Sequence, residues 1–85
     1  MSAWRQEGGA LVRELAFRDH DQALAFADAI AERAADHHRH PDLVIALNRV
    51  RIVIENLHHA GITRAERRLA EKVDAVVADL ASGPG

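Results

Sequence analysis

Apolar and polar residues alternate in three stretches of this chain, as expected of strands that lie on a core with one face. The stretches cover residues 11–17, 43–47 and 50–57. A shorter segment, residues 3–7, precedes Gly8-Gly9, and this pair predicts a tight hairpin turn because glycine tolerates positive φ. Asn48-Arg49 predicts a second two-residue turn, with Asn48 at positive φ. The pattern therefore predicts four strands in two hairpins.

A helix is predicted between the hairpins. Asp19 opens it, because its carboxylate can cap the first free amides, and Gln22 completes a variant of the capping box. The helix must end before Pro41, since the residue that precedes a proline is pushed out of the helical region. Its expected apolar face consists of Ala23, Phe26, Ala27, Ile30, Ala31 and Ala34.

A second helix follows the last strand. Thr63 is its expected cap, with Glu66 three residues later as the capping-box partner. Its expected core positions are Leu69, Val73, Val76 or Val77, and Leu80. The order ββαββα predicts one α+β domain over residues 1–85, a four-stranded antiparallel sheet with two helices on one face. Because the other face stays uncovered and a small domain gains by hiding a sheet edge, we expect a dimer at least.

Composition narrows the class of protein. A hydrophobic content of 48% is typical of a globular domain. The chain has no cysteine, which excludes disulfides and thiolate zinc sites, and its net charge of −2 gives no electrostatic reason to expect nucleic acid. No apolar run approaches a membrane span and the start of the chain lacks a signal-peptide core, so we expect a cytoplasmic protein.

Histidine is the side chain that can give and take protons near neutral pH. Five of the six histidines fall in two short windows, which suggests one shared site. They are His37, His38, His40, His58 and His59. The simpler interpretation of His37 and His38 is a solvated helix end, where the helix dipole favours histidine. Irregular spacing and the lack of a His-Glu-x-x-His motif argue against a metal site.

A basic cluster occurs on the second helix. Its members are Arg64, Arg67, Arg68 and Lys72. Glu66 and Glu71 balance part of this charge, so the cluster is interpreted as a solvated helix face and not as a nucleic-acid site.

A set of short motifs occurs in order along almost the whole chain. They are Phe17, Ala23 and Phe26 at the entry to the first helix, then His40-Pro41, Asn48, Val50 and Ile52, Gly61-Ile62-Thr63, and Leu69-Ala70 with Asp74. As an ordered set they resemble the pterin-4a-carbinolamine dehydratases. The resemblance implies removal of water from a 4a-hydroxytetrahydropterin by histidine acid/base chemistry, without a metal or an organic cofactor. It also implies a homodimer or homotetramer of the same fold.

The chain departs from the family's pattern at two histidine positions. Where the family has His-His-Pro, this chain has Arg39-His40-Pro41, and where it has Thr-His, this chain has Asn56-Leu57. Arginine stays protonated and leucine has no titratable group, so neither can shuttle protons.

The resemblance places three histidines as catalytic candidates: His40, with His38 or His58 to complete the set. Residues expected to line the substrate site are Arg39, Pro41, Asn56, Leu57 and Glu66, the last replacing the family's usual Asp.

The departures also open a second interpretation, a non-catalytic dimeric scaffold of the same fold. Some members of the family bind partner proteins, among them a transcription coactivator and a Rubisco assembly factor of carboxysomes. The expected partner is therefore a pterin substrate or another protein, with no direct contact to nucleic acid and none to a membrane.

Overall fold

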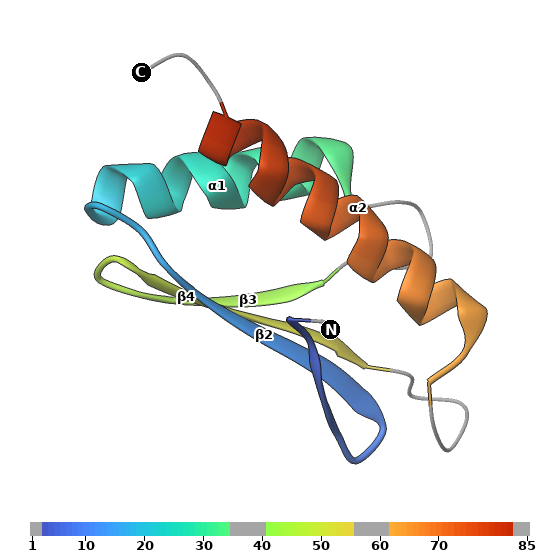
Figure 1. Cartoon of the computed structure of the whole chain (residues 1–85). Helices are drawn as coiled ribbons and strands as arrows, with labels where there is room; N and C mark the ends of the chain where they lie inside the picture. The colour runs from blue at the N-terminus through green and yellow to red at the C-terminus, as the bar shows by residue number, and fades with distance from the viewer. Residues whose placement is uncertain (1–2, 35–40, 56–61, 83–85) are drawn as a thin grey trace.

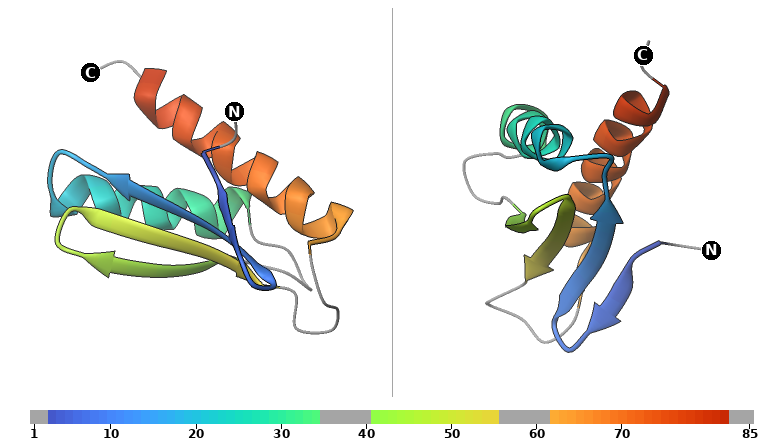
Figure 2. Two further views of the ribbon diagram at one scale, coloured as in Figure 1. Left: turned by 60° about the horizontal axis from the view of Figure 1, so that its bottom comes forward. Right: turned by 90° about the vertical axis from the view of Figure 1, so that its left-hand side faces the viewer.

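The computed structural model describes residues 3–34, 41–55 and 62–82, and it has the predicted element order (Figure 1). Strands β1 (Arg5–Glu7), β2 (Ala10–Ala16), β4 (Arg49–Glu55) and β3 (Asp42–Ala46) lie in that order in one antiparallel sheet. Helices α1 (His20–Arg33) and α2 (Arg64–Ser82) cover the same face of the sheet (Figure 2). The predicted α+β fold is confirmed.

The alternation along the strands decides which side chains enter the core. Val50, Ile52 and Ile54 of β4 are buried, while Arg49 and Arg51 between them are exposed. The buried side chains join one cluster with those of the helices. Its members from the two helices and from the C-cap of α1 are Ala23, Phe26, Ile30, Ala34, Leu69, Ala70, Val73 and Val76.

Two residues that were expected in the helical part of the core are exposed. Ala31 is exposed and Leu80 keeps 40% of its surface exposed, because both lie at the edge of the apolar stripe of their helix. In the described part of the chain neither helix is long and apolar enough to cross a membrane.

The first predicted turn is confirmed and the second is shifted by one residue. Gly8 has φ 61° between β1 and β2, as the sequence predicted. In the β3–β4 turn the residue at positive φ is Leu47, at 57°, and Asn48 follows it. The reason is a pair of hydrogen bonds between Asn48 and Phe17: the Asn48 Nδ2 donates to the Phe17 carbonyl at 2.7 Å, and the Phe17 amide donates to the Asn48 carbonyl at 2.8 Å. This pairing holds Asn48 beside Phe17, so the turn's strain falls on Leu47.

The start of α1 is built as expected, with one change of partner. Asp19 accepts a hydrogen bond from the Gln22 amide at 2.8 Å. The Gln22 side chain bonds back to the amide of Arg18 at 2.7 Å, one residue before the cap. At the other end of the helix, Arg33 forms an ion pair of 2.5 Å with Asp79, which ties α1 to α2.

Candidate functional site

Most of the site residues predicted from the sequence lie outside the residues that the structure describes. They are His38, Arg39, His40, Asn56, Leu57 and His58. The same holds for His37 and His59. Pro41 and Glu66 are the two predicted site residues that the structure places, and both are buried.

The structure places the chain on either side of both histidine windows. Pro41 leads into β3, whose first residue, Asp42, pairs with Val53 near the end of β4. Because β3 and β4 are antiparallel, the chain entering β3 and the chain leaving β4 attach to the same end of the sheet. The described end of α1 and the start of α2 lie on that side as well (Figure 1). The residues that flank the two windows therefore lie on the same side of the fold.

Glu66 is a buried charged side chain that follows the second histidine window closely in the sequence. It has no exposed surface, and its Oε1 accepts two hydrogen bonds from Thr63, from the amide at 3.0 Å and from the hydroxyl at 2.7 Å. The Arg67 amide bonds to the Thr63 carbonyl at 3.2 Å, which closes the first turn of α2. This is the back-bond of a capping box, as the Thr-x-x-Glu spacing predicted. The carboxylate therefore fixes where α2 begins.

A second polar cluster links the start of the chain to α2. Asp74 Oδ1 accepts hydrogen bonds from the Trp4 indole at 2.8 Å and from the Arg13 guanidinium at 2.5 Å. Arg13 comes from the core-facing side of β2, and its side chain is 17% exposed. A pocket of about 190 Å³ lies beside this cluster. Its lining residues are Trp4, Leu11, Arg67, Ala70, Glu71 and Asp74.

The sequence did not predict this second cluster. The available signal was a charged residue, Arg13, on the apolar side of an alternating strand. A cation in that position needs a carboxylate from a facing element, and here Asp74 of α2 supplies it.

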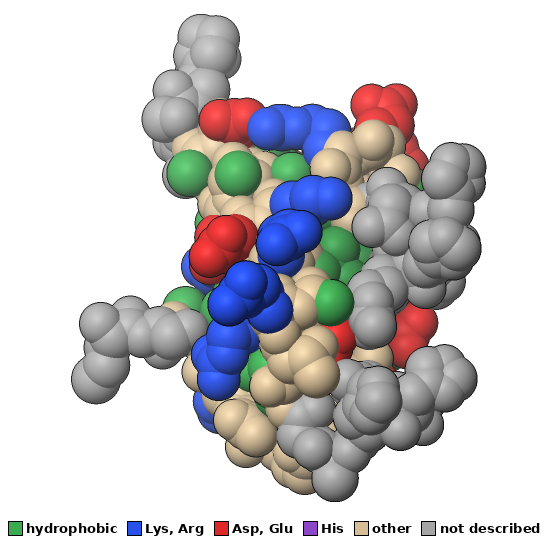
Figure 3. Space-filling model, turned by 90° about the vertical axis from the view of Figure 1, so that its right-hand side faces the viewer, with side chains coloured by type: hydrophobic (Ala, Val, Ile, Leu, Met, Phe, Trp, Pro, Cys, Tyr) green, Lys and Arg blue, Asp and Glu red, His purple; other side chains and the backbone are tan. Residues whose placement is uncertain are grey.

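The predicted basic cluster of α2 is fully on the surface. Arg64, Arg67, Arg68 and Lys72 are all exposed. On the side of the molecule where α2 begins, Lys and Arg side chains form a band (Figure 3). Within the described residues no ion pair involves any of these four side chains.

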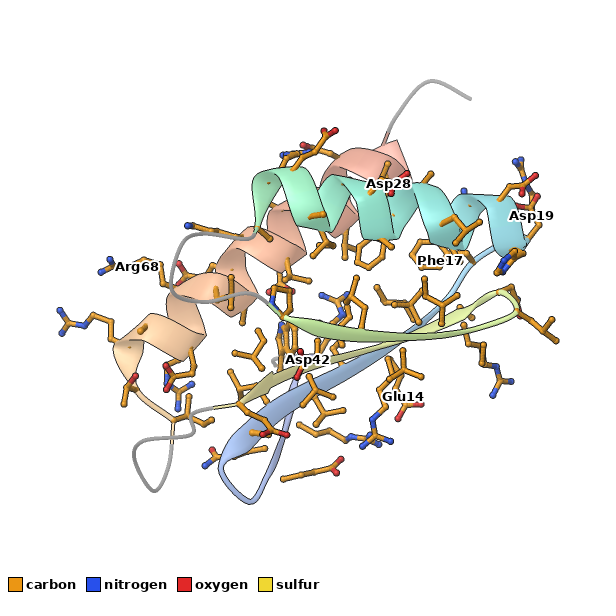
Figure 4. All side chains as sticks on the ribbon, turned by 180° about the vertical axis from the view of Figure 1, so that it is seen from behind. Glu14, Phe17, Asp19, Asp28, Asp42 and Arg68 are labelled. Atoms are coloured by element: carbon orange, nitrogen blue, oxygen red, sulfur yellow. The ribbon has the colours of Figure 1, made fainter. Side chains whose placement is uncertain are left out.

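The face of the sheet opposite the helices is open and carries a shallow groove of about 390 Å³. Glu14 points away from the helices on this side, whereas Phe17 points toward α1 (Figure 4). The groove is lined by Glu14, Leu15, Ala16, Val44, Ala46, Arg49, Val50 and Arg51. Its mixture of small, apolar and charged side chains is that of an exposed sheet face.

The pKa of Asp19 and the placement of possible metal ligands bear on the chemistry of the described residues. The hydrogen bond from the Gln22 amide holds the pKa of the Asp19 carboxyl below its usual value, and the neighbouring Arg18 adds to the effect. Asp19 caps the start of α1, at the opposite end of that helix from Arg33. Across residues 3–34, 41–55 and 62–82, no three His, Asp or Glu side chains gather as metal ligands would.

Comparison with known sequences gives a match along most of the chain. Residues 1–76 match the family model described as pterin 4 alpha carbinolamine dehydratase. A protein of Thermomicrobium roseum that carries this family's name is 38% identical over 79 residues, which are 93% of this chain and 81% of the relative. A similarly named protein of Metallosphaera sedula is 35% identical over 71 residues, 84% of this chain and 74% of the relative.

Two solved structures share the fold. A transcriptional coactivator/pterin dehydratase from Brucella melitensis has a TM-score of 0.76 and 26% identity, over 87% of this chain and 81% of that one. A pterin dehydratase-like protein, identified as a RuBisCO assembly factor in the alpha-carboxysome, has a TM-score of 0.73 and 29% identity. This second match covers 88% of this chain and 89% of the other.

Proposed function

This chain belongs to the pterin 4 alpha carbinolamine dehydratase family, and from that premise we propose that it dehydrates a 4a-hydroxytetrahydropterin to a quinonoid dihydropterin in the cytoplasm. The observation that carries the proposal is the match of the family model to residues 1–76. The fold adds support, because the chain flanking both histidine windows converges at one end of the sheet.

The proposed reaction is a balanced elimination of water. The carbon–oxygen bond at C4a breaks, its electron pair leaves with the hydroxyl, and a general acid protonates that oxygen to water. A general base takes the proton from the adjacent ring nitrogen, whose electrons form the new carbon–nitrogen double bond. Nothing is oxidised or reduced. Imidazoles suit both proton transfers, and each well-placed acid or base contributes about 10²–10⁴-fold in rate.

We assign the central catalytic role to His40, with His38 or His58 as the second imidazole. Arg39 and Leu57 occupy positions at which the family's pattern has histidine. Arg39 would bind an anionic group or donate a hydrogen bond to the pterin, since its pKa keeps it protonated. Pro41, Asn56, Leu57 and Glu66 complete the proposed substrate site, with buried Glu66 holding the start of α2 beside it.

The test is a dehydratase assay on a synthetic 4a-hydroxytetrahydropterin. The wild-type chain is expected to exceed the spontaneous rate, and His40→Ala is expected to return to it. The double variant Arg39→His/Leu57→His is the matched gain-of-function control, with a rise of about 10²-fold or more if the missing imidazoles limit the rate. A wild-type rate equal to that of buffer contradicts the proposal.

A second candidate function is a non-catalytic scaffold that binds another protein. Two observations favour it: Arg39 and Leu57 replace proton-transferring residues, and one similar structure is of a RuBisCO assembly factor. This function predicts no binding of reduced pterins and a partner contact on the exposed sheet or helix faces. Saturable binding of a reduced pterin, measured by calorimetry, would show that the pterin pocket is retained and would contradict this second function.

We further propose that the chain works as a homodimer or homotetramer joined through a sheet edge. The edges are β1 and β3, and β3 is the longer, with Val44 58% exposed. An unpaired edge of this kind offers free backbone groups to a second copy. Light scattering that gives a monomer at the concentration of the assay contradicts this arrangement.

A further inference from the structure

We propose that the exposed face of α2 over its first half binds an acidic helix of a partner protein. We call this face the basic stripe, and it consists of Arg64, Arg67, Arg68 and Lys72. The proposal does not depend on the dehydratase function, because it uses none of the residues assigned to the chemistry.

The stripe has a regular spacing along α2. Arg64, Arg68 and Lys72 are four residues apart, so at 1.5 Å of rise per residue they stand about 6 Å from one another along the helix and span about 12 Å. Arg67 widens the stripe on one side. Arg68 points out from α2, away from the sheet (Figure 4), and the Lys and Arg side chains of this side form one band (Figure 3).

The stripe is unfavourable for the helix that carries it. The N-terminal end of a helix has partial positive charge, which favours acidic and disfavours basic side chains in the first turn. Like charges four residues apart also repel each other. An anionic partner would relieve both effects, so the stripe fits a binding surface better than a stabilising feature.

Most other arginines of the described chain are neutralised by neighbours. Arg5 pairs with Glu7 and Glu14, Arg13 with Asp74, and Arg33 with Asp79. The four cations of the stripe have no such ion pair within the described residues. Their charge is therefore available to a partner.

An acidic helix fits the stripe better than nucleic acid does. The stripe is short, Glu71 lies within it, and Asp74 and Asp79 follow along the same helix. The whole chain carries −2, so a long polyphosphate would meet a repulsive field beyond the stripe. A partner helix with carboxylates at positions i, i+4 and i+8 has the same rise and presents three anions at the spacing of the three cations.

A second copy of this chain matches the stripe less well. The exposed acidic residues of α1 are Asp21, Asp28 and Glu32, which are seven and four residues apart. Only one of these steps equals the four-residue repeat of the stripe. Arg33, next to Glu32, would also bring a cation toward the stripe.

The test uses the intact chain and two labelled helical peptides of one composition. The first carries three glutamates at i, i+4 and i+8, and the second has the same glutamates distributed around the helix. By fluorescence anisotropy at low salt, the first peptide is expected to bind about 10-fold more tightly. Arg64→Gln/Arg68→Gln should remove that preference. The matched control Arg49→Gln/Arg51→Gln neutralises two exposed arginines on the far face of the sheet and should leave binding unchanged.

Several outcomes would overturn the proposal. Equal binding of the two peptides would show that the stripe does not recognise the spacing of carboxylates along a helix. If a single-stranded oligonucleotide or anionic lipid vesicles bind more tightly than the first peptide, the stripe binds another class of partner. If light scattering shows that Arg64→Gln/Arg68→Gln converts an oligomer to a smaller species, the stripe contacts a second copy of this chain instead of a partner protein. Loss of peptide binding leaves the dehydratase assay untouched, so the two proposals can fail separately.

Discussion

Helices α1 and α2 begin in opposite electrostatic ways. At the start of α1, Asp19 caps the helix on the surface and Asp21 adds a second negative charge in the first turn. At the start of α2, the cap-bound carboxylate of Glu66 is completely buried and the exposed positions carry Arg64, Arg67 and Arg68. Acidic side chains are favoured at a helix N-terminus and basic ones are not. Only α1 follows this preference on its surface.

The difference shows that two roles are separated at the start of α2. One buried carboxylate satisfies the amide and the hydroxyl of Thr63, so the helix is fixed from the inside. The outer face is then free to carry charges that do not stabilise the helix. In α1 one exposed side chain, Asp19, both caps the helix and meets solvent, so capping there depends on pH.

The largest expected effect is on Glu66. Replacing it with Ala leaves the Thr63 amide and hydroxyl without their buried acceptor and should lower the free energy of unfolding by about 2–3 kcal/mol. Urea denaturation measures this loss. Glu66→Gln keeps the volume and an acceptor, so it should cost clearly less. A loss within about 0.5 kcal/mol for Glu66→Ala would mean that α2 is held by packing alone.

A smaller and pH-dependent effect is expected at Asp19. The pKa of Asp19 is lower in the folded chain than in the unfolded chain, where it is about 4, so the charged cap stabilises the fold above that pH. Asp19→Ala should therefore lower the thermal midpoint at neutral pH. This gap to wild type should narrow as the pH falls through the folded pKa. Asp19→Asn, a cap without a charge, should show no such pH dependence, and a gap that stays constant into acid would contradict the charge-based account.

The smallest effect is expected from reversing a charge at the start of α2. Arg64→Glu should raise the free energy of unfolding by about 0.3–1 kcal/mol at low salt, because the new carboxylate faces the positive end of the helix dipole. Added salt should reduce the gain. Lys72→Glu, two turns further along, is the matched control and should gain less. If Arg64→Glu destabilises the chain, the arginine contributes to folding and the contrast between the two helix starts is lost.

The periodicities of the sequence predicted the elements because backbone geometry depends on few residues at a time. Alternation placed Val50, Ile52 and Ile54 on one face, and Thr63 with Glu66 predicted the start of α2. The shifted turn at Leu47 could not be predicted in this way. It depends on Asn48 meeting Phe17, a contact between residues 31 positions apart.

The candidate site also has a part that the sequence predicted and a part that it did not. Histidine windows and motif order were enough to predict the family, and the structure describes Pro41 and Glu66 among the predicted site residues. The cluster of Trp4, Arg13 and Asp74 escaped prediction, because its members lie up to 70 positions apart and come together only when the start of the chain and β2 fold onto α2.

The sequence by itself determined the order of the elements, the apolar face of each one and membership of a family, since all of these depend on residue types at short, regular spacings. The tertiary structure decided which charges are shared and which remain available. It brought Asp74 to Trp4 and Arg13, and it buried Glu66 completely. It left the cations of the basic stripe exposed without ion pairs in the described chain. The physical reason is that an ion pair requires two side chains within about 4 Å, a distance that folding sets between residues far apart in the chain.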